Sequence, residues 1–122
     1  MLPTKRKEKK MEIIKKSRED LNKKELYNMI DNPDISKMSE LAGEDVDVID
    51  WVLYRSVSIS TGEEHDVLSI VTSTGTYATN SPTFIESFTR IVECFEGDFS
   101  KIKIFENSSK RGRKFLMCKY TD

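Results

Sequence analysis

Four cations surround a glycine near the end of the chain, and they are the densest group of side chains with ligand-binding chemistry. Lys110, Arg111, Arg113 and Lys114 lie on either side of Gly112. Such a cluster neutralises the backbone phosphates of a nucleic acid, and glycine lets the two backbones approach closely. Many hairpins carry lysines only for solubility, so the binding hypothesis also needs side chains that recognise bases.

A protein that holds an unpaired nucleic-acid strand needs flat side chains, because each stacked base contributes about 1 to 3 kcal/mol. Three aromatic residues lie on expected strands, and each of them could instead pack against the N-terminal part of the chain. Arg55 interrupts the apolar face of its strand, so it either meets phosphate or pairs with a carboxylate. The predicted nucleic-acid-binding residues are Tyr54, Arg55, Tyr77, Lys103, Phe105, Lys110, Arg111, Arg113 and Lys114.

The sequence has no combination of side chains that is typical of a catalytic or metal site. Cys94 and Cys118 form no Cys-x-x-Cys or Cys/His cluster, and the one histidine is His65. We expect two buried thiols in a reducing compartment and a solvated imidazole. We expect no metal, no cofactor and no enzymatic activity.

Charge is segregated along the chain, although the net charge is only −1. Residues 1–24 hold ten Lys and Arg against four Asp and Glu, residues 25–98 hold three against fifteen, and residues 99–122 hold seven against two. The basic ends are therefore the expected contacts for phosphate. We expect the acidic middle to repel nucleic acid and restrict it to one path.

The length of 122 residues fits one domain, and no apolar stretch approaches the length of a membrane span. We expect a soluble protein that is not exported and has no membrane contact. Residues 1–11 are rich in lysine and lack apolar periodicity, which predicts a disordered basic arm. Residues 12–122 then form a single domain with a helical extension at its N-terminus.

Two short helices are predicted before the strands. Asn22 and Glu25 have the spacing of a capping box, which predicts a helix over residues 23–30. Asn32-Pro33 resembles a second helix start, and the apolar residues that follow recur at helical spacing up to the next glycine. We expect both helices to plug one open end of the domain that follows.

The apolar period then changes from helical to two, which indicates strands. The alternation shifts by one residue between Val48 and Trp51, which predicts a long first strand bent by a bulge near Ile49-Asp50. A second strand is predicted over residues 66–72, and a third over residues 76–80 after a tight turn.

A longer helix is predicted after the third strand, because Ser81 can cap its first turn and Pro82 favours the first helical position. Its apolar stripe consists of Phe84, Phe88, Ile91 and Phe95. Two more strands follow, over residues 101–105 and 114–120, and the four cations lie in the loop between them.

Three extended segments, a helix and two further extended segments follow one another in the order of an OB-fold. We therefore expect a mainly β domain with some α structure. Its core would be a five-stranded Greek-key barrel with a helix between strands 3 and 4 and two short N-terminal helices. In that fold the loop between the last two strands flanks the binding groove.

The chain also resembles small single-stranded DNA-binding proteins encoded by phages and mobile elements of Gram-positive bacteria. The similarity involves the acidic first strand that leads into DWVLY at residues 50–54, YATNSPTF at residues 77–84, and the basic loop before Phe115. It covers roughly residues 23–118. The resemblance implies an OB-type barrel that coats exposed DNA during replication, repair or conjugative transfer.

Two functional hypotheses are consistent with these patterns. The first is a non-enzymatic, cytoplasmic single-stranded DNA-binding protein of a bacterial host cell, with low sequence preference and with replication proteins as further candidate partners. RNA is an alternative ligand, because stacking tolerates either sugar. The second is a protein-interaction module whose acidic middle docks on a basic surface of a host or replication partner. Both hypotheses leave the oligomeric state open.

Overall fold

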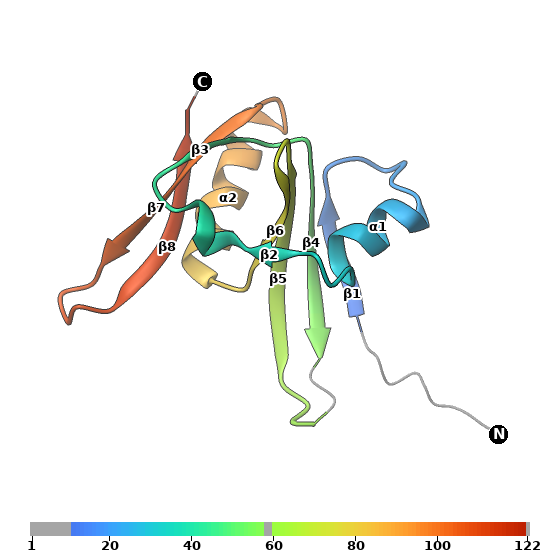
Figure 1. Cartoon of the computed structure of the whole chain (residues 1–122), viewed down its shortest axis with the longest axis horizontal. Coiled ribbons are helices and arrows are strands. Elements are labelled where there is room, and N and C mark those ends of the chain that lie inside the picture. Colours follow the sequence, from blue (N-terminus) through green and yellow to red (C-terminus); the bar gives the residue numbers. More distant parts are fainter. Residues whose placement is uncertain (1–10, 58–59, 122) are drawn as a thin grey trace.

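The computed structural model describes residues 11–57 and 60–121, so the arm predicted for residues 1–11 lies outside it except for Met11. The strands form two sheets (Figure 1). The five-stranded sheet has the order β1 (Met11–Lys16), β4 (Asp50–Val57), β5 (Glu64–Thr72), β6 (Gly75–Thr79) and β2 (Ser36–Lys37). The three-stranded sheet has the order β3 (Asp45–Asp47), β7 (Lys101–Ser108) and β8 (Lys114–Tyr120).

The chain passes from one sheet to the other between β3 and β4. The N–H of Val48 donates to the carbonyl of Ser100 at 2.8 Å, and the N–H of Ile49 donates to the carbonyl of Val71 at 2.8 Å. Backbone pairing therefore changes from the β7 side to the β5 side within two residues. The bend predicted near Ile49-Asp50 is confirmed, but the single long strand predicted there is divided into β3 and β4, which belong to different sheets.

Helix α2 (Pro82–Phe95) forms where the sequence predicts it. The Ser81 side chain accepts a hydrogen bond from the N–H of Phe84 at 3.3 Å, and proline occupies the start of the first turn. The helix ends at Glu96, whose φ of 53° is left-handed, and Gly97 follows.

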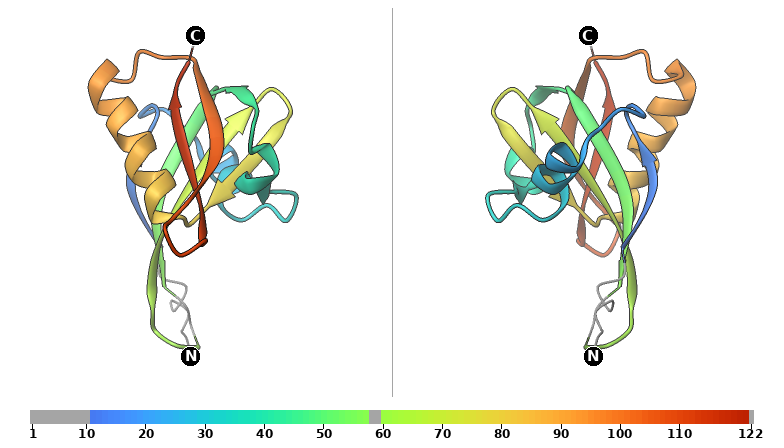
Figure 2. Two further views of the ribbon diagram at one scale, coloured as in Figure 1. Left: turned by 90° about the vertical axis from the view of Figure 1, so that its left-hand side faces the viewer. Right: turned by 90° about the vertical axis from the view of Figure 1, so that its right-hand side faces the viewer.

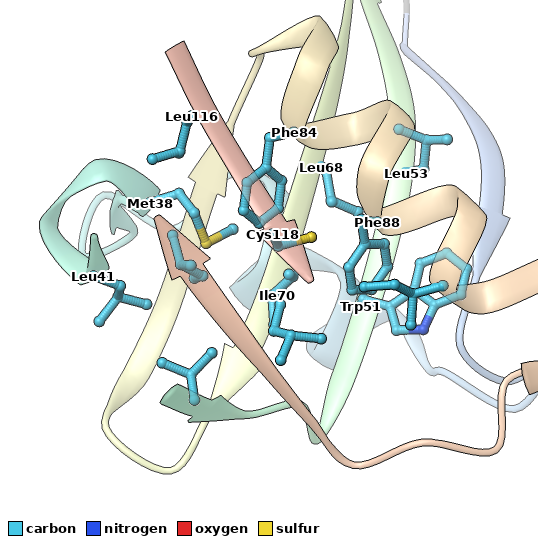
Figure 3. Close-up of a cluster of buried hydrophobic side chains, with 14 residues drawn as sticks. Met38, Leu41, Trp51, Leu53, Leu68, Ile70, Phe84, Phe88, Leu116 and Cys118 are labelled. Atoms are coloured by element: carbon cyan, nitrogen blue, oxygen red, sulfur yellow. The ribbon is translucent and has the colours of Figure 1, made fainter. Parts of the chain in front are cut away.

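The apolar face of α2 packs between the sheets and forms the main core (Figure 3). Trp51 meets the ring of Phe88 edge-on, with 5.4 Å between ring centroids. The largest side chains of this core that are almost completely buried are Phe84, Phe88, Met38, Leu68, Ile70, Ile102 and Ile104.

Helix α1 (Lys23–Ile30) is also confirmed, with both hydrogen bonds of the capping box between Asn22 and Glu25. It does not plug an end of the core. Met29 packs with Val52 and Tyr54 on the face of the five-stranded sheet that is turned away from the main core. Neither α1 nor α2 has the length and apolar composition needed to cross a membrane.

The second short helix predicted from Asn32-Pro33 is wrong in its extent. The Asn32 side chain accepts a hydrogen bond from the N–H of Asp34 at 2.8 Å, which forms a local turn. Strand β2 then pairs in parallel with β6, and only Met38–Leu41 (η2) is helical, as one 3₁₀ segment. Long-range pairing with β6 therefore overrides the helical spacing of the apolar residues.

The prediction of a mainly β fold with some α structure is confirmed, but the described residues form no closed barrel. Closing the two sheets into a barrel would require β6 of the five-stranded sheet to pair with β8 of the three-stranded sheet. Instead β2 pairs with β6, and α2 lies against β8. The Thr83 hydroxyl donates to the carbonyl of Leu116 at 2.8 Å, and the N–H of Cys118 donates to the Ser87 hydroxyl at 3.1 Å.

The prediction of two buried thiols is half wrong. Cys118 is buried beneath α2, whereas Cys94 is exposed, and both are free. Cys94 follows Glu93 on the side of α2 that does not face the sheets. Burial raises the pKa of the Cys118 thiol to about 11.

We expect Ser87→Ala to lower the free energy of unfolding by about 1 to 3 kcal/mol, because the N–H of Cys118 loses its acceptor. Thermal or urea denaturation measures the change. Thr89→Ala is the matched control, since no side-chain hydrogen bond of Thr89 exists within the described residues. Equal stability of the Ser87 and Thr89 variants would contradict the role of α2 at the β8 edge.

We also expect a thiol reagent at neutral pH to modify one cysteine of the native chain, Cys94, and both cysteines in denaturant. The unfolded chain loses the Cys118 proton near pH 9.0 and the folded chain only near pH 11. The free energy of unfolding contributed by this thiol therefore falls as pH rises through that window. Rapid native reaction in a Cys94→Ser variant would contradict the burial of Cys118.

Candidate nucleic-acid interface

The β7–β8 hairpin has one face in the core and one face away from it. Ile102 and Ile104 of β7 and Leu116 and Cys118 of β8 are buried in the core. The alternate residues of both strands therefore lie on the outer face. We call five of them the platform: Lys103, Phe105, Phe115, Met117 and Lys119.

The register of the two strands makes the platform continuous. Phe105 lies opposite Met117, and Lys103 lies opposite Lys119. Phe115 is opposite Asn107, so Phe105 and Phe115 are diagonal neighbours, about 7 to 8 Å apart at the backbone. The Lys119 ammonium lies over the Phe105 ring, 5.8 Å from its centroid, so a base stacked on that face would replace it there. The half-buried rings of Phe105 and Phe115 and the thioether of Met117 thus form an apolar surface with lysines at its border.

The predicted basic loop connects the two strands at the tip of the hairpin, which projects from the body of the protein (Figure 1). The N–H of Ser109 donates to the carbonyl of Arg113 at 2.9 Å, and the N–H of Gly112 donates to the carbonyl of Ser109 at 2.9 Å. Gly112 has a φ of +81°, which favours glycine. The loop is therefore fixed by its own backbone, while the side chains of Lys110, Arg111, Arg113 and Lys114 are exposed.

The arginines of the basic loop differ from the other described arginines in their partners. Arg18 pairs with Asp50 at 3.0 Å, Arg55 pairs with Asp66 at 3.0 Å, and Arg90 lies 3.4 Å from Glu86. Within residues 11–57 and 60–121, neither Arg111 nor Arg113 has a carboxylate within 4.0 Å. The positive charge of the loop is thus available to an anionic ligand.

Six of the nine predicted residues lie on this hairpin, namely Lys103, Phe105, Lys110, Arg111, Arg113 and Lys114. The other three, Tyr54, Arg55 and Tyr77, lie on the five-stranded sheet and take no part in the platform.

Tyr54 is a correction to the predicted site. Its exposed fraction is 8%, and it packs with Leu21, Met29 and Val52 beneath α1. Burial raises the pKa of its hydroxyl. A base cannot reach the ring, because α1 covers the sheet face to which Tyr54 belongs.

Arg55 and Tyr77 are also engaged within the protein. The guanidinium of Arg55 donates to Asp66 on the adjacent strand, and this hydrogen bond raises the pKa of Arg55. Of the two outcomes predicted for Arg55, the structure therefore shows the carboxylate pair. Tyr77 is half-buried against the main core, and its hydroxyl is 3.2 Å from the Thr74 hydroxyl.

Sequence reasoning missed three platform residues, Phe115, Met117 and Lys119. The alternation of residues 114–120 contains the signal, since Leu116 and Cys118 are apolar and buried and their neighbours must face outward. The strand was predicted, but its outer face becomes a surface of rings and cations only when β7 lies beside it in the observed register.

Carboxylates border the platform on its β3 side. Asp45 lies opposite Lys103, and Asp47 lies opposite Lys101. The Ser73 hydroxyl donates to Asp47 at 2.8 Å and lowers the pKa of that carboxyl group. A polyanion on the platform is therefore repelled from β3 and directed along β7 and β8 toward the basic loop.

His65 is half-exposed on β5, with its Nε2 atom 3.8 Å from Glu63. Among the residues that the structure describes, no group of three or more His, Cys, Asp and Glu side chains is arranged to hold a metal ion.

Comparison with protein-family models, with curated proteins and with solved structures finds no match to this chain. A functional proposal for this chain therefore rests on the residues and geometry described above, together with the resemblance noted from the sequence.

We expect Phe105→Ala and Phe115→Ala each to weaken binding of a single-stranded oligonucleotide by about 1 to 3 kcal/mol, or about 5- to 150-fold, because each removes a stacking surface. Fluorescence anisotropy with a labelled oligonucleotide measures the loss. Tyr27→Ala is the matched control, because Tyr27 is a 51% exposed aromatic residue on α1. Equal affinities of all three variants and the wild type would remove the platform from the binding site.

Proposed function

We propose that this protein is a non-enzymatic single-stranded DNA-binding protein with low sequence preference. We further propose that it acts in the cytoplasm of a bacterial host, in the replication or transfer of phage or mobile-element DNA. The observation that supports the proposal most is the continuity of the platform with the basic loop. Rings suited to stacking lie beside cations that have no carboxylate partner among the described residues.

The arrangement of the strands supports an open variant of the OB-fold. β3 and β4 together correspond to a bent first strand, β5 and β6 complete a meander, and α2 precedes the last two strands. β1, α1 and β2 are then additions to that layout. The basic loop lies between the last two strands, where OB-folds place a ligand-binding loop.

The chemistry of the platform favours an unpaired strand. Bases in a duplex are stacked on one another and expose only their edges, whereas an unpaired strand offers base faces to the rings of Phe105 and Phe115. A duplex would therefore bind only through phosphate contacts with the basic loop.

Low sequence preference follows from the same side chains. Phe105, Phe115 and Met117 have no group that forms strong hydrogen bonds with a base edge. Lysine and arginine on phosphate position a strand without reading its sequence. The platform tolerates either sugar and therefore does not distinguish DNA from RNA. The choice of DNA in this proposal rests on the resemblance to phage and mobile-element proteins.

The alternative of an acidic docking module is less favoured. Some carboxylates of the acidic middle are engaged within the protein: Asp50 binds Arg18, Asp66 binds Arg55 and Asp47 binds Ser73. A basic partner would have to compete with these contacts.

We expect oligo-dT to bind with an affinity that falls as salt rises, because phosphate contacts release counterions. Arg111→Gln with Arg113→Gln removes two cations that have no partner among the described residues, so the slope of log K against log salt should become shallower by about 1.4. Lys23→Gln with Lys24→Gln removes the same charge from α1 and should leave the slope unchanged.

The titration also includes duplex DNA and RNA of the same length. Absence of oligo-dT binding at low salt would overturn the proposal, and a salt-insensitive complex would overturn its phosphate contacts. Equal or tighter binding of duplex would overturn stacking as the basis of recognition. Clear preference for RNA would replace the DNA assignment.

A further inference from the structure

The two sheets have four outer strands, and they differ in how their free edges are protected. β2 has two residues and β3 has three, so neither offers a long edge. The edge of β8 is covered by hydroxyls of α2. β1 has six residues, and no strand within the described residues pairs with its outer side.

Figure 2 shows β1 at the margin of the five-stranded sheet, with α2 beside it. A hollow of about 720 Å³ lies between them, lined by Ile14, Lys15, Trp51, Val92 and Glu93 among others. Met11 and Ile14 on β1 are 39% and 38% exposed. An unpaired strand edge with exposed apolar side chains is a template for another strand.

The charges of β1 are arranged on its two faces by an irregularity in its pairing with β4. The register shifts between Ile13 and Lys15, so that Glu12 lies opposite Arg55 and Lys15 lies opposite Leu53. Arg55 and Leu53 are two residues apart on β4 and share a face. Glu12 and Lys15 therefore also share one face of β1, although they are three residues apart.

Lys16 lies on the other face of β1. It is opposite Val52, which packs with Tyr54 beneath α1, and Met11 is opposite Ser56 on that same side. Of the residues Met11, Glu12, Lys15 and Lys16, only Glu12 and Lys15 are opposite charges on the same face of β1.

We propose that two copies of this chain associate through their β1 edges in antiparallel pairing. With Ile13 of one copy opposite Ile14 of the other, Glu12 of each copy lies opposite Lys15 of its partner, and Met11 lies opposite Lys16. Parallel pairing in register would place Glu12 against Glu12 and Lys15 against Lys15, which is repulsive. The antiparallel contact is isologous and closes after two copies.

This association leaves the candidate nucleic-acid interface open. β1 and the β7–β8 hairpin lie on opposite sides of the view in Figure 1. A dimer would therefore present two platforms, and it does not depend on the proposed function.

The test is sedimentation equilibrium of the full chain over a range of concentrations. We expect the wild type to reach twice the mass of one chain. Glu12→Lys and Lys15→Glu should each raise the dimer dissociation constant about tenfold or more, because each places like charges opposite one another twice. Lys16→Glu is the control, because it changes the net charge by the same amount as Lys15→Glu. Residue 16 lies opposite Met11 of the other copy, so this variant should dimerise like the wild type.

An equimolar mixture of the Glu12→Lys and Lys15→Glu chains should recover the dimer, since both cross-strand pairs are then attractive. Circular dichroism melting of each variant separates loss of association from loss of folding. A wild type that keeps the mass of one chain at every concentration would overturn the proposal. Failure of the folded variants to recover the dimer on mixing would overturn it equally.

Discussion

The contact between α2 and the edge of β8 is the constraint on which the arrangement of this protein depends. Buried backbone groups need hydrogen-bond partners, and along the edge of β8 that faces away from β7 these partners are the hydroxyls of Thr83 and Ser87 rather than another strand. The helix therefore holds β8 away from β6, and the bend between β3 and β4 connects the two sheets. The β7–β8 hairpin keeps its inner face in the core, and the platform lies on its outer face.

The charged side chains of the protein differ in whether they have partners within it. Some carboxylates of the acidic middle bind arginine or serine: Asp50 binds Arg18, Asp66 binds Arg55 and Asp47 binds Ser73. Arg111 and Arg113 have no such partner among residues 11–57 and 60–121. A net charge of −1 therefore conceals a local positive field at the hairpin tip, next to rings that lie between lysines.

The features that could be predicted from the sequence have local causes. The caps at Asn22 and Ser81, the change of phase before Trp51 and the basic loop around Gly112 each depend on a few adjacent residues. The errors came from contacts between distant segments: β6 recruits residues 36–37 into a strand, α1 buries Tyr54, and side-chain hydroxyls of α2 prevent barrel closure. Phe115 and Met117 become part of a surface only through the register with β7.

Amide chemical-shift mapping of the labelled chain with oligo-dT tests the central claim most directly, because it locates the ligand without any substitution. The largest shifts should fall on residues 101–119, in the platform and the basic loop, and they should diminish as salt rises. Residues of α1 and of the β2–β6 edge should change little. Largest shifts on α1 or along β2, or no shifts at low salt, would contradict the β7–β8 hairpin as the nucleic-acid interface.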